Sequence, residues 1–212
     1  MIDVIMPSYG RPHALKKAAD NAYENTKNSM ILTFVFEPTD EESIKVAKEI
    51  GKKYILSKYP GNHTGAANTA YEMTDEPFFI IANDDFNFHK DWDVPAIEKM
   101  VDPVIGVVGL NDGSNTGFTA ITLVRRVYIE TQSGCMDIPN TLYFPGYNHN
   151  YVDTEFSSTA KKRGAYIACP ESVVEHMHWA FGKSVMDATY EKSNATSQAD
   201  SITFGNRCHL WQ

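Results

Sequence analysis

The chain has 212 residues, and at roughly 150 residues per domain this length favours one large domain over two. Hydrophobic residues make up 42% and charged residues 22% of the sequence, which is typical of a folded globular protein and excludes a disordered one. Nineteen Lys and Arg against 27 Asp and Glu give a net charge of −8, which argues against broad nonspecific binding to nucleic acid or anionic membranes.

The longest apolar runs, residues 30–36 and 77–82, are far shorter than the roughly 20 residues of a membrane-spanning helix. The N-terminus lacks a basic start followed by an apolar segment, so we expect no signal peptide and a cytoplasmic protein. The three cysteines are widely separated and form no C-x-x-C pair. This spacing favours reduced thiols over a disulfide framework or a zinc knuckle.

The first half of the chain predicts alternating strands and helices. Continuous apolar runs predict strands at residues 2–6, 31–36, 54–56 and 77–82. Helix-forming segments lie between them, at residues 11–25, 41–50 and 63–73. Strands that are apolar throughout, with helices between them, imply a sheet covered on both faces. We therefore predict an α/β, Rossmann-like single domain with a central, mostly parallel sheet flanked by helices, and a ligand site at the carboxyl ends of the strands.

The second half is less regular. Strands are expected at residues 104–110, 118–124, 166–169 and 172–175, and helices at 126–132 and 153–163. Residues 180–212 are polar and aromatic with weak periodicity, which predicts a C-terminal tail or lid packed on the domain.

The triplet Asn83-Asp84-Asp85 directly follows an apolar strand. Two adjacent carboxylates at a strand end repel each other unless a cation neutralises them, so the triplet favours a metal site. A plain turn or helix cap is the alternative, because Asn and Asp dominate turns. Asp91 and Asp93, which follow soon after, favour the metal.

His176 and His178 alternate along a short predicted strand, so both imidazoles can lie on one face. They are candidate metal ligands, although a core histidine or a surface pair is the alternative. A site built from Asp84, Asp85 and one histidine is rich in oxygen and suits Mg²⁺ or Mn²⁺ better than Zn²⁺.

The order of these motifs resembles the GT-A glycosyltransferases, especially inverting family 2, over residues 2 to about 178. Such enzymes open with a strand that ends in a Pro-rich turn, here MPSYGRP, and carry an acidic residue after the second strand, here Glu37. An Asn- and Gly-bearing loop then leads into a helix, here residues 61–68, followed by the metal-binding acidic triplet. The segment from Cys169 to His176 resembles the closing strand whose histidine ligates the metal.

The resemblance implies a set of donor and metal contacts. Tyr9 is expected to stack on the nucleotide base and Glu37 to accept its imino proton. The full set of implied donor contacts is Pro7, Tyr9, Arg11, Glu37, Asn62, Gly65, Asn68, Asn83 and Asp84. The implied ligands of Mn²⁺ or Mg²⁺ are Asp84, Asp85, His176 and His178. The sequence departs from the family pattern in two places here, because the triplet begins with Asn and the loop lacks the Arg often found beside Asn68.

Residues 151–156 resemble the acceptor-side acidic helix of the family, with Val152-Asp153 in place of the usual Glu-Asp pair. Asp153 is then the expected general base that removes the proton of the acceptor hydroxyl, and Glu155 is its competitor. The alternative for Asp153 is a helix-capping carboxylate.

These features predict a metal-dependent inverting glycosyltransferase that moves a sugar from a nucleotide diphosphate sugar, most simply a UDP sugar, to an acceptor hydroxyl. Residues 1–110 would bind the donor, 111–179 the acceptor and metal, and 180–212 would be the tail. The acceptor is left open among a glycan, a protein and a hydroxymethylated base in DNA, as is the oligomeric state. Alternative functions are a nucleotidyltransferase or metal-dependent hydrolase on the same scaffold, or a noncatalytic nucleotide-sugar-binding module.

Overall fold

The computed structural model describes residues 1–114 and 119–212. Its strands are β1 (Ile2–Pro7), β2 (Met30–Phe36), β3 (Lys53–Leu56), β4 (Phe78–Ile81), β5 (Phe86–Phe88), β6 (Val107–Asn111), β7 (Thr122–Arg125) and β8 (Tyr166–His176). Its helices are α1 (Leu15–Asn25), α2 (Glu41–Glu49), α3 (His63–Met73), α4 (Asp93–Lys99), α5 (Arg126–Gln132), α6 (Val152–Lys162) and α7 (Ala188–Arg207), with short 3-10 helices η1 (Trp179–Phe181) and η2 (Cys208–Leu210). No helix in these two ranges is long and apolar enough to cross a membrane.

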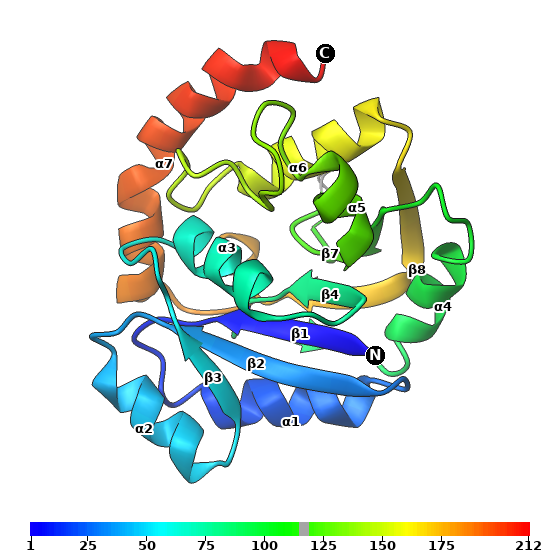
Figure 1. Cartoon of the computed structure of the whole chain (residues 1–212). Coiled ribbons are helices and arrows are strands. Elements are labelled where there is room, and N and C mark those ends of the chain that lie inside the picture. Colours follow the sequence, from blue (N-terminus) through cyan, green and yellow to red (C-terminus); the bar gives the residue numbers. More distant parts are fainter. Residues whose placement is uncertain (115–118) are drawn as a thin grey trace.

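The strands form one sheet in the order β3-β2-β1-β4-β7-β6-β8-β5. The pairs β1–β2, β1–β4, β2–β3 and β6–β8 are parallel, whereas β4–β7, β6–β7 and β5–β8 are antiparallel. Figure 1 shows the helices arranged around this sheet. The predicted α/β class is confirmed. The regular first half of the chain builds the parallel strands β3, β2, β1 and β4, and the second half adds the parallel pair β6–β8.

Strand β1 shows how both faces of the sheet are covered. Ile2, Val4 and Met6 pack into one hydrophobic core with side chains of α1 and α2. Ile5 packs into a second core with side chains of α3 and α6. Figure 1 accordingly shows α1 and α2 on one side of β1 and α3 on the other. Burial on both faces explains why the strand is apolar almost throughout.

The carboxyl ends of β1, β2 and β4 meet at one edge of the sheet. In the parallel register, Pro7 of β1 lies beside Val35 of β2, and Ile5 lies beside Ile81 of β4. The residues that follow these strands therefore emerge close together. They are the loop 8–11, Glu37 and the triplet 83–85.

Strand β8 is continuous over 11 residues. The prediction of two short strands in this segment is therefore wrong. The pairing of β8 with β6 contains an irregularity in register, so the exposed residues Pro170 and Glu171 interrupt the apolar pattern without ending the strand. The strand predicted at 118–124 is found at Thr122–Arg125, and Phe118 lies outside the described residues. The short elements β5 and α4 were not predicted.

Most of residues 180–212, the segment predicted to be a C-terminal tail or lid, form α7, a helix of 20 residues. Asp187 caps this helix by accepting two hydrogen bonds of 3.0 Å from backbone N–H groups of its first turn. The buried residues of α7 are Tyr190, Asp200 and Arg207, so the buried face is mostly charged. The hydrophobic periodicity that predicts a helix is weak for this reason. Figure 1 shows α7 extending along one side of the molecule to the C-terminus.

Asp3 is a fully buried carboxyl group in β1. Burial raises the pKa of Asp3 to about 6, and the negative charge of Glu76 adds to that rise. Thr33, Lys53 and Arg126 act in the opposite direction without cancelling it. The folded chain therefore keeps the Asp3 proton at a pH where an exposed aspartate has lost it.

This shift predicts a pH-dependent stability. The unfolded chain releases the Asp3 proton near pH 3.8, whereas the folded chain holds it to about pH 6, so stability from protonated Asp3 is complete below pH 3.8 and is lost as the pH rises through 6. As the pH rises from 4 to 7, we expect the unfolding free energy of the wild type to fall by up to about 3 kcal/mol relative to that of Asp3→Asn. Urea unfolding at both pH values measures this fall. If the unfolding free energies of the two proteins differ by the same amount at pH 4 and at pH 7, Asp3 has no raised pKa and the burial account is contradicted.

Candidate functional site

Two adjoining cavities open at the edge where β1, β2 and β4 end. The first cavity has a volume of about 110 Å³ and lies between these strand ends and the first turns of α7. The second cavity has a volume of about 330 Å³ and lies between the beginnings of α3 and α6 and the side of α7. His63, Asn83, His149 and Tyr190 belong to the lining of both. Two molecules bound in the two cavities would therefore both contact these shared residues.

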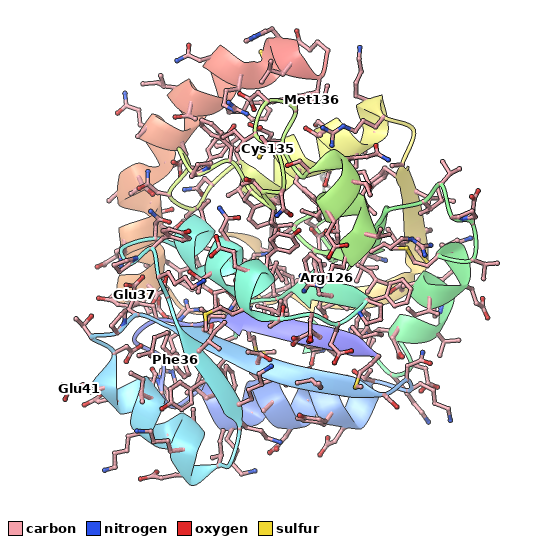
Figure 2. All side chains as sticks on the ribbon, in the orientation of Figure 1. Phe36, Glu37, Glu41, Arg126, Cys135 and Met136 are labelled. Carbon is pink, nitrogen blue, oxygen red and sulfur yellow. The ribbon has the colours of Figure 1, made fainter. Side chains whose placement is uncertain are left out.

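The first cavity brings together most of the predicted donor and metal residues. Its lining includes Pro7, Tyr9, Arg11, Glu37, Asn62, Asn83, Asp84, Asp85, His176 and His178. Figure 2 shows Glu37 directly after Phe36 at the end of β2, on the side of the molecule where α7 begins. These side chains thus lie together at the carboxyl ends of the strands, where the strand pattern predicts a ligand site.

Gly65 and Asn68 are not among the described residues that line either cavity. Asn62 is the N-cap of α3, and its Oδ1 accepts a hydrogen bond from the N–H of Gly65 at 2.7 Å. A Cβ atom at Gly65 would lie 2.1 Å from the carbonyl oxygen of Tyr59, so the close packing here requires glycine. Asn68 exchanges two hydrogen bonds of 2.9 Å with the backbone of Tyr143. Both residues shape the site without facing it.

Arg11 balances the adjacent carboxylates Asp84 and Asp85. Asp84 accepts hydrogen bonds from Arg11 Nη1 at 2.8 Å and from Ser8 Oγ at 2.5 Å. Burial raises the pKa of Asp84, and the charge of Arg11 opposes that rise. Arg11 Nη1 also lies 3.7 Å from Asp85 Oδ2. The guanidinium therefore offsets the repulsion between the two carboxylates.

Asp85 is held as an anion. Its Oδ2 accepts a hydrogen bond from the Tyr190 hydroxyl at 2.7 Å and lies 3.4 Å from His176 Nε2. Burial alone would raise the pKa of Asp85, but His176 and Tyr190 together hold it far below its usual range. Asp85 Oδ1 and His176 Nε2 are buried, and neither has a hydrogen-bond partner among the described residues. Such a pair of unpartnered ligand atoms fits a divalent cation.

The hydrogen bonds of the predicted metal ligands indicate which of these side chains can bind a cation. Within residues 1–114 and 119–212, no group of three or more His, Cys, Asp or Glu side chains is arranged to hold a metal ion. Both oxygens of Asp84 are occupied by Ser8 and Arg11. His178 Nδ1 accepts a hydrogen bond from the backbone N–H of Ala180 at 3.2 Å. Asp85 and His176 are therefore the two side chains best placed to bind a cation, and further ligands would have to come from a bound molecule.

The first turns of α7 complete the first cavity, and the contacts of Asp187 and Thr189 there were not predicted. Asp187 holds Arg11 through two hydrogen bonds, of 2.8 and 3.0 Å. Thr189 Oγ1 donates to the carbonyl oxygen of Tyr9 at 2.9 Å, and Lys192 Nζ lies 3.9 Å from the centre of the Tyr9 ring. The available sequence signal was the Asp-Ala-Thr pattern at the start of α7, which is typical of a helix N-cap.

Asp153 lines the second cavity at the beginning of α6. Its Oδ1 accepts a hydrogen bond of 2.8 Å from the N–H of Thr154. Burial raises the pKa of Asp153. The rings of His63 and His149 lie 4.8 Å apart in the wall shared with the first cavity, and neither residue was predicted. The structure thus separates Asp153, in the second cavity, from the acidic pair in the first.

Glu155 is not among the described residues that line the two cavities. Two residues apart on a helix differ by about 200° in direction, so Asp153 and Glu155 cannot face one cavity. Glu155 is buried, accepts hydrogen bonds from Arg207 of α7 at 2.8 and 2.9 Å, and accepts one from the Tyr147 hydroxyl at 2.8 Å. Arg207 also pairs with Asp137 at 2.7 Å. The alternative base predicted from the sequence is instead part of an ion-pair network that fastens α7 to α6.

Comparison with known proteins agrees with this arrangement. Residues 3–175 match the family Glycosyl transferase family 2. No curated protein is significantly similar to the chain in sequence.

Three solved structures illustrate the similarity in fold. The mannosyltransferase PcManGT from Pyrobaculum calidifontis, in complex with GDP-Man and Mn²⁺, has a TM-score of 0.63 at 16% identity and aligns with 82% of this chain and 56% of its own. Glucosyl-3-phosphoglycerate synthase from Mycobacterium tuberculosis, in complex with Mn²⁺, UDP and glucosyl-3-phosphoglycerate, has a TM-score of 0.70 at 11% identity, with 99% and 80% covered. TarS from S. aureus has a TM-score of 0.65 at 10% identity, with 82% and 36% covered.

The chain spans about half the length of the mannosyltransferase and about a third of TarS. At these identities the structures establish a common fold, which confirms the GT-A fold predicted from the motifs. The family match extends over most of the chain and includes the acidic triplet and β8 up to Glu175. The chain therefore belongs to glycosyl transferase family 2.

Proposed function

We propose that the chain is a metal-dependent inverting glycosyltransferase that moves a sugar from a nucleotide diphosphate sugar, with a UDP sugar as the first candidate, to an acceptor hydroxyl. The observation that carries this proposal is the pair of adjoining cavities, one holding an acidic pair with cationic side chains and the other a separate carboxylate. Family membership supports it, as do similar structures solved with UDP or GDP-Man and Mn²⁺.

The first cavity suits the nucleotide diphosphate. Arg11 and Lys192 supply positive charge on its lining, which favours a diphosphate. The exposed ring of Tyr9 offers a surface for the base. Glu37 uses Oε1 to accept a hydrogen bond from the N–H of Gly61 at 2.8 Å, so Oε2 is left for the base. These side chains would orient the donor with its sugar toward the wall shared with the second cavity.

Asp85 and His176 would hold Mn²⁺ or Mg²⁺ in this proposal, and Asp84 would position Arg11 and Ser8 rather than bind the cation. When bound, the cation supplies a positive charge that stabilises the diphosphate as a leaving group. Arg11 adds a second positive charge on the same side.

Asp153 would act as the general base in the second cavity. An acceptor hydroxyl is a weak nucleophile, and a carboxylate that takes its proton during attack makes it effective. The proton would pass from the hydroxyl to the Asp153 carboxylate, on the side of the sugar away from the diphosphate, which gives inversion. Burial raises the pKa of Asp153 and so makes it a stronger base than an exposed aspartate.

The metal role of Asp85 is tested with Asp85→Asn, which keeps the size of the side chain but removes its charge. We expect Mn²⁺-stimulated release of UDP from a UDP sugar to fall roughly a hundredfold or more, because several kcal/mol of leaving-group stabilisation is lost. The matched control is Asp91→Asn, an exposed aspartate outside both cavities, which should keep its activity. Unchanged Mn²⁺ stimulation in Asp85→Asn, or wild-type release that resists EDTA, would refute the metal assignment.

The base role is tested with Asp153→Asn, which retains an oxygen for the Thr154 N–H but cannot take a proton. We expect kcat for transfer, or for donor hydrolysis with water as acceptor, to fall by about 10²- to 10⁴-fold. UDP affinity measured by calorimetry should stay at the wild-type value, because Asp153 is outside the first cavity. Near-normal turnover in this variant would show that Asp153 is only a helix cap.

Glu155→Gln separates the structural carboxylate from the proposed base. Arg207 loses one charged partner and keeps Asp137, so we expect the unfolding free energy to fall by about 1.5–3 kcal/mol. UDP affinity should not change at temperatures where both proteins are folded. A variant with wild-type stability and lost transfer would move the base role to Glu155.

A further inference from the structure

The second cavity has a consistent chemical character. Apart from its histidines and Asp153, its polar side chains are uncharged: the amides Asn83, Asn150 and Asn194 and the hydroxyls Thr154, Ser193 and Ser197. Among the described residues, no Lys or Arg lines it. The sequence of residues 115–118, Asn-Thr-Gly-Phe, contains no basic side chain either. The site's cationic residues Arg11 and Lys192 line the first cavity only.

Four histidines line the second cavity, and two of them, His176 and the adjacent His178, lie at the proposed cation position. The other two, His63 and His149, do not supply the missing positive charge. Burial lowers the pKa of His63 to about 3 and that of His149 to about 4, so both rings are neutral at physiological pH. The ring nitrogens of these two residues make no hydrogen bond to the rest of the described chain. A neutral imidazole both donates and accepts, which suits a hydroxyl group.

Backbone N–H groups, which often bind phosphate, are already occupied beside this cavity. Asp200 of α7 is fully buried and accepts hydrogen bonds of 2.8–2.9 Å from three successive backbone N–H groups, those of Asn148, His149 and Asn150. Asp153 accepts from the N–H of Thr154 at the beginning of α6. Two positions that could hold an anion thus hold carboxylates of the chain itself, and these would repel a phosphate.

The aromatic rings of the cavity are also engaged. Tyr151 stacks on Phe204 of α7 with ring centres 5.1 Å apart. Tyr143 is only 7% exposed and packs edge-on against Phe156. An extruded nucleic-acid base is held by stacking between side chains, and Tyr143 and Tyr151 are already packed against rings of the chain itself. Amides, hydroxyls and neutral imidazoles instead match the many hydroxyl groups of a sugar.

We propose that the second cavity binds an uncharged sugar or polyol as acceptor and discriminates against phosphorylated and carboxylated acceptors. This inference rests on the proposed function, because it assigns the second cavity to the acceptor of that reaction. The acceptor hydroxyl would lie against Asp153, and the remaining hydroxyls would bind the amides and imidazoles of the wall.

The test compares paired acceptors by calorimetry on the protein saturated with UDP and Mn²⁺. Each pair consists of a neutral sugar or methyl glycoside and its phosphate ester. We expect the neutral member to bind at least about tenfold more tightly, a difference of about 1.4 kcal/mol. Asn194→Lys places a cation on the lining and should narrow this ratio. Gln198→Lys makes the same charge change on an exposed position of α7 outside the lining and should leave the ratio unchanged.

Phosphate esters that bind as tightly as their neutral partners would overturn the inference, and so would a lack of binding by every neutral sugar tested. An oligonucleotide with a hydroxymethylated base that binds where the sugars do not would assign the cavity to a nucleic acid instead. If UDP and Mn²⁺ themselves fail to bind, the proposed function is refuted. The same pairs are then compared on the protein alone, so the charge preference is still decided.

Discussion

The site depends on one guanidinium group, that of Arg11, which lies between three carboxylates. Asp84 and Asp85 are neighbours in sequence at the end of a buried strand, where unbalanced negative charge is unfavourable. Arg11 comes from the loop after β1 and contacts both of them, and its other nitrogens hold Asp187 at the start of α7. One side chain therefore connects the first strand, the acidic triplet and the C-terminal helix. Removing it would take away the positive charge that Asp84 and Asp85 share at the centre of the first cavity.

The distribution of charge around this centre suits the two ligands of the proposed reaction. Cationic side chains lie on the lining of the first cavity, where a diphosphate would bind. The second cavity is lined by the Asp153 carboxylate, histidines, amides and hydroxyls, and among the described residues no Lys or Arg lines it. Helix α7 contributes to both, because Asp187 fixes Arg11 and Asp200 fixes the loop 148–150. The helix is fastened at its far end by the ion pair between Arg207 and Glu155, which thus supports the geometry of the site.

Much of the fold and part of the site could be predicted from the sequence, and the reason is physical. Strands buried on both faces are mostly apolar, as β1 is apart from Asp3, and parallel strands bring the residues that follow them to one edge. Tyr9, Glu37 and Asp85 were predicted together on this ground and line one cavity. Helix α7 could not be recognised by its apolar pattern, because the residues it buries include Asp200 and Arg207. The roles of its residues depend on contacts over long sequence separations, which spacing does not reveal.

The central claim is that Asp85 and His176 bind a divalent cation beside a nucleotide diphosphate held by Arg11. A crystal structure of the chain with UDP and Mn²⁺, with data collected at the manganese absorption edge, tests it most directly. The account predicts an anomalous peak that is coordinated by one Asp85 oxygen and by His176 Nε2, with the diphosphate next to Arg11. Nucleotide bound in the first cavity without manganese at Asp85, or manganese at a different group of side chains, would contradict it.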